Sequence, residues 1–261
     1  MKENKNFAWK NIMKKSISSL IFLIASILIL SCSTTHTLHE KIIYKDDDFN
    51  NEKLHNSRFV IWGISSNLDI GDQERINYSV LLSDILYHKK LQTSHSIDIV
   101  HTNQLMYRIG ETDLINMMKK FDQDKIFDQK TMQFVRDTIP DAKYLLIAFI
   151  KNENIVDDTP YEEYVKDDGE KEKLQTTYKK TYILTVEFQI YDTFLGKLVL
   201  NSSITNETKR TEKVVEEPVD SVGDLVLDIL LGDSTDTEPA KIDRKKVLVK
   251  TFEKFADQLL D

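Results

Sequence analysis

The stretch Tyr144-Leu145-Leu146-Ile147-Ala148-Phe149-Ile150 decides the fold of this chain, because it is apolar at almost every position. A strand of this composition is covered on both faces and lies in the middle of a sheet. A second run of the same kind, Phe59–Ile64, opens the folded region at Arg58. The two runs predict buried strands, and we expect an α/β fold built on a mixed sheet (α+β).

Helices and one short strand are predicted between the two runs. A helix begins at Asp72, which can cap it, and its apolar stripe reaches Lys89-Lys90. Ile97–His101 predicts a short strand. Thr102–Asp122 predicts one or two helical segments with a break at Gly110, and Asp128–Asp137 predicts a further helix that Asp128 caps and the following proline ends.

An antiparallel hairpin follows the central strand. Thr181–Tyr191 alternates apolar and polar residues, which is typical of a strand with one wet face. Asp192–Gly196 predicts a turn, and Lys197–Thr208 predicts a more polar strand that we expect at a sheet edge. Apolar stripes in Val222–Leu230 and Leu248–Leu260 predict two amphipathic helices at the end of the chain.

The amino-terminal residues read as a targeting segment. Five lysines between Lys2 and Lys15 precede Ile17–Leu30, an uncharged run of 14 residues. That length fits a signal-peptide core of about 7 to 15 residues and is short of the roughly 20 residues that span a bilayer. The sequence Ile29-Leu30-Ser31-Cys32 that follows resembles the lipobox of bacterial lipoproteins.

The lipobox resemblance implies that Cys32 carries a lipid. In that family a diacylglyceryl group alkylates the thiol, the signal is cut between Ser31 and Cys32, and the freed amine is acylated; no other cofactor is expected. Several acyl chains on one residue anchor a protein stably, whereas a single chain holds only marginally. Ser33, where an aspartate would favour the inner membrane, implies the outer membrane with the protein facing the periplasm. The other interpretation is a signal anchor with a chance cysteine.

These features predict three parts of the chain. Residues 1–31 form the signal peptide, and 32–57 form the lipidated cysteine and a polar, weakly patterned tether. Residues 58–261 form a single mixed α/β domain, which includes an acidic loop over 153–175 and the C-terminal helices over 221–261.

Three stretches resemble a group of envelope proteins. Phe59–Ile64, the helix-to-strand passage Asp137–Ile147 and the turn Tyr191–Lys197 are similar to parts of the curli-secretion-type lipoproteins, the penicillin-binding-protein activator lipoprotein B and the amino-terminal domain of the Tol translocation protein. The resemblance covers about Arg58 to Thr208 and implies their mixed sheet. The chain departs from the pattern at Ile139-Pro140, which replaces a glycine region, and by two extra residues in the turn.

Composition and motifs argue against an enzyme or a nucleic-acid binder. The formal net charge is −8, whereas nucleic-acid binders need a positive footprint, and the single cysteine cannot form an intramolecular disulfide. Gly63-Ile64-Ser65-Ser66-Asn67 lacks the second glycine of a nucleophile elbow. Neither His88 nor His101 has metal-ligand spacing to another histidine, so we expect no metal site; copper or zinc binding at these two residues would require tertiary contact.

The acidic segment 153–175 contains nine acidic residues and three lysines. One interpretation is a solvated, mobile loop. The other is a docking surface for a basic partner, in which aromatic anchors stand among carboxylates. The residues of this surface would be Tyr161, Glu162, Glu163, Tyr164, Asp167 and Asp168.

The leading hypothesis from the sequence is a non-catalytic, lipid-anchored outer-membrane protein. It would act in the periplasm by binding or assembling another envelope protein. The alternatives are an oligomeric curli-type secretion-pore subunit and a surface-exposed lipoprotein that binds ligands; a divergent hydrolase comes last.

Overall fold

The computed structural model describes residues 32–93, 96–166, 172–216 and 240–260. The contacts divide the chain into two compact units. The first comprises Met1–Thr35, Asp157–Thr181 and Lys209–Lys241, and the second comprises His36–Val156, Tyr182–Thr208 and Ile242–Asp261. The predicted mixed α/β domain over 58–261 contributes residues to both units.

The described strands form one seven-stranded sheet with the order β1-β7-β6-β4-β2-β3, and β5 pairs with β6. β2 is parallel to β3 and to β4, whereas β5 is antiparallel to β6, so the sheet is mixed. The predicted α/β (α+β) fold class is therefore confirmed. The strands are β1 (Cys32–Lys45), β2 (Arg58–Ser66), β3 (Asp98–Val100), β4 (Ala142–Asp157), β5 (Tyr161–Lys166), β6 (Glu172–Asp192) and β7 (Lys197–Glu216). The helices are α2 (Asn51–Leu54), α3 (Asp72–Gln92), α4 (Thr102–Ile109), α5 (Glu111–Asp124), α6 (Gln129–Thr138) and α8 (Arg244–Leu260).

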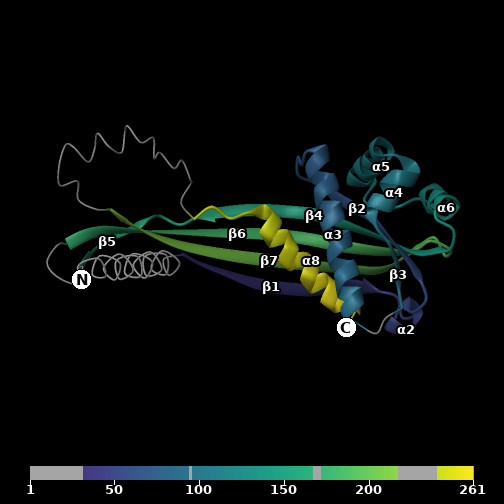
Figure 1. Cartoon of the computed structure of the whole chain (residues 1–261), viewed down its shortest axis with the longest axis horizontal. Helices are drawn as coiled ribbons and strands as arrows, with labels where there is room; N and C mark the ends of the chain where they lie inside the picture. Colours follow the sequence, from purple (N-terminus) through teal and green to yellow (C-terminus); the bar gives the residue numbers. More distant parts are fainter. Residues whose placement is uncertain (1–31, 94–95, 167–171, 217–239, 261) are drawn as a thin grey trace, which may run out of the picture. The chain divides into compact units, whose positions relative to one another are not determined.

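The two faces of β2 and β4 belong to separate hydrophobic clusters of the second unit. On one face the strands pack against α3 and α8, where Leu82 and Phe252 are fully buried. On the other face they pack against α4, α5 and α6, where Trp62 and Phe121 are buried. Figure 1 shows α3 and α8 crossing the same side of the sheet. The prediction of a central strand over Tyr144–Ile150 is therefore confirmed.

A bulge bends β2 at Gly63. The register between β2 and β4 shifts between Ile61 and Gly63, and Gly63 has a φ of 142°. A Cβ atom at this position would lie 2.2 Å from Met118 Cε and 2.7 Å from Ser79 Oγ. Glycine is required here both by the backbone conformation and by the close approach of α3 and α5 to the strand.

The helix boundaries follow the local sequence with one correction. Gly110, with a φ of 87°, separates α4 from α5, and the Asp128 carboxylate caps α6 by accepting from the backbone N–H of Thr131 at 2.7 Å. The cap residue of α3 is Gly71, not Asp72. Asp72 is the first helical residue, and its carboxylate instead pairs with Lys119 at 2.7 Å.

Residues 33–57 are not a tether in the structure, because they contain β1 and α2. The backbone N–H of Asp46 donates to the carbonyl of Val199 at 2.9 Å, and His36 Nδ1 lies 2.9 Å from Thr208 Oγ1. Since β1 pairs with β7, β7 lies inside the sheet, and the prediction that it forms an edge was wrong.

The side chains of β1 explain why the sequence did not reveal this strand. Leu38 is partly buried against the core, but Ile42, Ile43 and Tyr44 are all at least 43% exposed. A strand that buries so little has no apolar stripe for pattern analysis to detect.

The acidic segment 153–175 forms strands rather than a loop over its described residues. β4 continues to Asp157, β5 follows, and β6 begins at Glu172. β5 and β6 are antiparallel, with Tyr161 opposite Thr177 and Tyr164 opposite Leu174. The correction has a simple cause: backbone pairing between neighbouring strands stabilises a polar sequence that buries few side chains.

The end of the chain agrees with the sequence where it is described. α8 covers the predicted helix Leu248–Leu260, and Phe252 and Phe255 are fully buried. The predicted helix Val222–Leu230 and the signal peptide 1–31 lie outside the described residues. In the part of the chain that the structure describes, no helix is both long enough and apolar enough to cross a bilayer.

Candidate functional site

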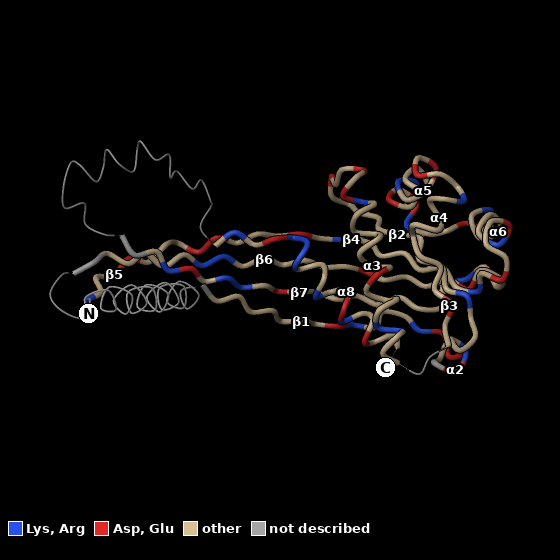
Figure 2. Tube along the Cα trace, viewed as in Figure 1, with Lys and Arg blue, Asp and Glu red and all other residues tan. Residues whose placement is uncertain are grey.

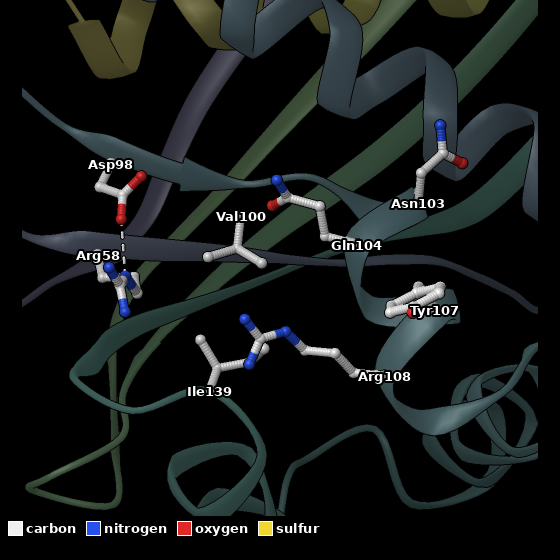
Figure 3. A pocket seen from close by; sticks show the side chains of 8 residues that line it. All are labelled: Arg58, Asp98, Val100, Asn103, Gln104, Tyr107, Arg108 and Ile139. Atoms are coloured by element: carbon white, nitrogen blue, oxygen red, sulfur yellow. Dashed lines mark hydrogen bonds and ion pairs between the residues drawn. The ribbon is translucent and has the colours of Figure 1, made fainter.

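A groove of about 680 Å³ lies in the second unit, where β2 and β3 begin (Figure 3). Its walls and floor come from β2, β3, α4 and the residue that ends α6. The lining residues are Arg58, Asp98, Val100, Asn103, Gln104, Tyr107, Arg108 and Ile139.

The floor of the groove is apolar and buried. Val100, the last residue of β3, is 7% exposed, and Ile139, the residue that ends α6, is 1% exposed. Both residues belong to the hydrophobic cluster beneath α4, α5 and α6. The floor is thus continuous with the core of the unit.

Arg58 forms one wall of the groove at the first position of β2. The parallel register places Arg58 opposite Asp98, and Arg58 Nε donates to Asp98 Oδ2 at 2.7 Å. Arg58 Nη1 also donates to the carbonyl of Pro140 at 2.8 Å. Two partners from separate segments therefore hold this guanidinium in place.

The exposed face of α4 forms the opposite wall. Asn103 and Tyr107, like Gln104 and Arg108, are four residues apart, so each pair shares one side of the helix. Arg108 Nη1 donates to the carbonyl of Thr138 at 3.0 Å. Tyr107 is 92% exposed.

The end of α6 and the connection to β4, residues 138–141, form a junction that positions both arginines. Thr138 and Pro140 each offer a backbone carbonyl to a guanidinium, and Asp141 turns the chain into β4 with a φ of 63°. The backbone of the junction thus places two cations on one groove.

Cationic and anionic residues are otherwise mixed in the second unit. Figure 2 shows Lys and Arg interspersed with Asp and Glu along its helices and strands. Asp98 is the acidic residue among those lining the groove, where it pairs with Arg58 at 2.7 Å, and Arg108 is the second cation. The groove therefore has a surplus of positive charge in a chain whose formal net charge is −8.

The residues predicted for a docking surface occupy β5 where they are described. Tyr161 and Tyr164 are 61% and 74% exposed, but a spacing of three along a strand places them on opposite faces. Glu163 Oε1 accepts from Gln175 Nε2 of β6 at 2.8 Å. The two tyrosines therefore do not form one aromatic patch. Asp167 and Asp168 lie outside the described residues.

The predicted lipidation residue, Cys32, is the first residue of β1. Ser31, on the other side of the predicted cleavage point, lies outside the described residues. The structure therefore shows a strand beginning where the signal peptide is predicted to end.

Ser65 and His101, two polar residues of the second unit outside the groove, have structural partners. Ser65 is fully buried and its hydroxyl donates to the carboxylate of Asp122, which also pairs with Arg75 at 2.9 Å. His101 caps α4 and lies 2.8 Å from Asp84. Over the described residues, no three His, Cys, Asp or Glu side chains gather as a possible metal site.

The groove was not predicted from the sequence. Thr102–Asp122 was predicted to be helical, and Leu105 is indeed buried, but no role was given to the polar face of α4. The pattern Asn103-Gln104 followed by Tyr107-Arg108 was the available signal. That signal is weak, because a polar helix face is usually only solvated.

Comparison with known proteins does not assign a family. No protein-family model matches the chain, and no curated protein matches it. Solved structures match at low identity. A PelC dodecamer from Paraburkholderia phytofirmans is 11% identical, with 87% of this chain and 98% of that chain covered and a TM-score of 0.36. A PelC variant dodecamer from the same organism is 11% identical, with 87% and 99% covered and a TM-score of 0.37.

A third solved structure is similar at the same level. It is a putative neuraminyllactose-binding hemagglutinin homolog from Helicobacter pylori, 11% identical, with 83% of this chain and 86% of that chain covered and a TM-score of 0.29. Similarities this weak do not assign a ligand, a partner or an assembly to this chain.

Proposed function

We propose that this chain is a non-catalytic, lipid-anchored protein of the bacterial cell envelope that binds another envelope component through the groove. The sequence Ile29-Leu30-Ser31-Cys32 after an apolar run of signal-peptide length carries the anchoring part of the proposal. We further propose that the protein is anchored in the outer membrane and faces the periplasm. The same proposal includes its relation to the curli-secretion-type lipoproteins and the penicillin-binding-protein activator lipoprotein B.

The structure adds a consequence for the anchor. If the mature chain begins at Cys32, the acyl chains attach to the first residue of β1, and no free tether precedes the sheet. An anchor fused to a strand restricts how the protein can move on the membrane, whereas a tether of 25 residues would let it move about 25 to 30 Å from the lipid.

The groove carries the binding part of the proposal. It joins an apolar floor to side chains that donate hydrogen bonds, which is the composition of a recognition site. Its lining residues include neither a serine, cysteine or lysine nucleophile nor a histidine base. Non-catalytic ligand binding is therefore the function that this site supports best.

Two measurements on intact cells test the proposal. Replacing Cys32 with Ala should abolish incorporation of labelled fatty acid and release the protein from the membrane fraction. A photo-crosslinking residue in place of Tyr107 should capture a specific envelope component, whereas the same residue at the exposed Tyr87 of α3 serves as the control. Undiminished label in Cys32→Ala, or identical capture at both positions, would contradict the proposal.

The secretion-pore alternative finds less support. It requires the β6–β7 hairpin to present an apolar side to lipid. In the second unit, Ser202 Oγ donates to Gln258 Oε1 at 2.7 Å and Asn206 Nδ2 donates to the carbonyl of Val247 at 3.1 Å. This side of β7 is polar and covered by α8. The surface-exposed alternative is tested by protease accessibility of the groove on intact cells.

A further inference from the structure

We propose that the groove recognises a carboxylate, held between Arg58 and Arg108, on a ligand whose ring or apolar body lies against Tyr107. This inference rests on the proposed binding function and names the chemical class of its ligand.

The two guanidinium groups retain unused hydrogen-bond donors. Each guanidinium has five N–H donors in a planar fork. Over the described residues, Arg58 donates to Asp98 and Pro140, and Arg108 donates to Thr138. Arg58 and Arg108 both line the groove, and a carboxylate can accept two guanidinium N–H groups at once.

The charge balance favours a monoanion. Asp98 stays at 2.7 Å from Arg58, so it offsets one of the two positive charges and leaves a surplus of one. A carboxylate matches this surplus. A phosphate dianion would add a second negative charge beside Asp98, where like charges repel.

Tyr107 supplies a surface for the rest of the ligand. The residue is 92% exposed, although an aromatic ring is usually covered or used in an interface. Gln104 adds a directed polar group: its Oε1 accepts from the backbone N–H of His101 at 3.2 Å, so its amide Nε2 is left to donate. A sugar acid and the carboxyl terminus of a peptide both carry a carboxylate beside such a body.

Contacts within the protein position the side chains of the groove. Backbone carbonyls on one short junction hold both arginines, and Val100 and Ile139 fix the floor within the core. A preorganised site loses less conformational entropy on binding than a site that must form around its ligand. The arrangement is therefore suited to a small charged group rather than only to a large interface.

Titration of the full chain in detergent by calorimetry tests the inference. The probes are D-glucuronic acid, which represents sugar acids, and N-acetyl-dialanine, which represents peptide carboxyl termini. Each has a neutral control: D-glucose and N-acetyl-dialanine amide. At least one acid should bind and its control should not, and the acid that binds identifies the source of the carboxylate. Inorganic phosphate should bind more weakly than that acid.

Three variants localise the binding. Arg108→Gln should weaken binding of the acid by about 10-fold or more, because it removes charge-assisted hydrogen bonds. Tyr107→Ser should weaken it as well, whereas Arg136→Gln should leave it unchanged, since Arg136 lies on α6 outside this groove and donates to the carbonyl of Thr193. Far-UV circular dichroism checks that each variant folds.

Some outcomes would overturn the inference. They are equal binding of an acid and its neutral control, tighter binding of phosphate, no binding by either acid, or unchanged affinity in Arg108→Gln. The fatty-acid label on Cys32 and the crosslinks from position 107 do not depend on these titrations. If both persist while neither acid binds, the carboxylate inference fails and the proposed function stands. If label and capture both fail while an acid binds at Arg108, the proposed envelope role fails instead.

Discussion

A polar cluster that links α8 to the sheet offers the sharpest test of how the second unit is stabilised. Arg244, the first residue of α8, forms a two-pronged ion pair with Glu153 of β4: Nε lies 3.0 Å from Oε1, and Nη2 lies 2.7 Å from Oε2. The hydroxyl of Tyr182 on β6 donates to the same carboxylate. Burial, followed by this hydrogen bond to Glu153, raises the pKa of Tyr182, and the hydrogen bond with Glu153 raises the pKa of Arg244.

The expected cost of Glu153→Gln follows from the exposure of the pair. The Glu153 side chain is 14% exposed and the Arg244 side chain is 30% exposed, so the pair lies between a buried and a surface ion pair. The glutamine side chain keeps one oxygen acceptor, but it loses the negative charge and one of the two hydrogen bonds to the Arg244 guanidinium. A hydrogen bond to a charged group contributes about 1.5 to 3 kcal/mol and exposed pairs about 0 to 1, so we expect a loss of about 2 kcal/mol.

Glu253→Gln on the same helix is the matched control. Glu253 pairs with Lys250 at 2.8 Å, but both side chains are about half exposed, at 46% and 50%. Its removal should change the free energy of unfolding by less than about 0.5 kcal/mol.

Urea denaturation followed by tryptophan fluorescence measures both variants. In a chain that begins at Ser33, Trp62 is the sole tryptophan, and it is buried in the second unit, so the signal reports that unit. With an m-value of about 2 kcal/mol/M, the midpoint of Glu153→Gln should fall by about 1 M. Equal midpoints for Glu153→Gln and Glu253→Gln would refute the reasoning.

Three further predictions concern local structure. Gly63→Ala should lower the free energy of unfolding by about 3 kcal/mol or more in the same assay, because its Cβ would lie 2.2 Å from Met118 Cε and its φ is 142°; a loss below 1 kcal/mol would contradict the account of the bulge. Phe255→Ala should cost about 3 to 5 kcal/mol, because the ring is fully buried and stacks on Phe188 at 3.9 Å, and wild-type stability would refute it. Asp128→Ala should cost about 1 kcal/mol at pH 7 through loss of the helix cap, as measured by urea midpoints. Hydrogen bonds lower the pKa of Asp128 from 3.8 to about 2, so its contribution is present above about pH 4 and is lost as the pH falls through 2; a gap from wild type that stays constant down to pH 2 would exclude this mechanism.

The sequence predicted the elements whose evidence is local. Seven consecutive positions over Tyr144–Ile150 are buried because β4 lies between β2 and β6 with helices on both faces, and the apolar run already implied such a place. Gly110 and Asp128 marked helix ends for reasons that depend only on backbone conformation and on one side-chain acceptor. Fold class followed from these patterns without knowledge of long-range contacts.

Strands that bury few side chains could not be recognised in this way. Backbone pairing with a neighbouring strand stabilises β1, β5 and the parts of β6 and β7 that belong to the first unit. That neighbouring strand can be distant in the sequence. The contact between His36 and Thr208 joins residues 172 positions apart. A polar segment such as 33–57 reads as a tether until the strand that pairs with it is known.

The groove shows the same division most clearly. The sequence by itself determined that α4 has an apolar face for the core and a polar face for solvent, because helical periodicity is a local property. Only the tertiary structure decided that Arg58 and Arg108 would line one groove. Arg58 donates to the carbonyl of Pro140, 82 residues away, and Arg108 donates to the carbonyl of Thr138 in the same junction. A binding site of this kind depends on how parallel strands align and where a connecting loop ends. The lining residues by themselves predict neither of these.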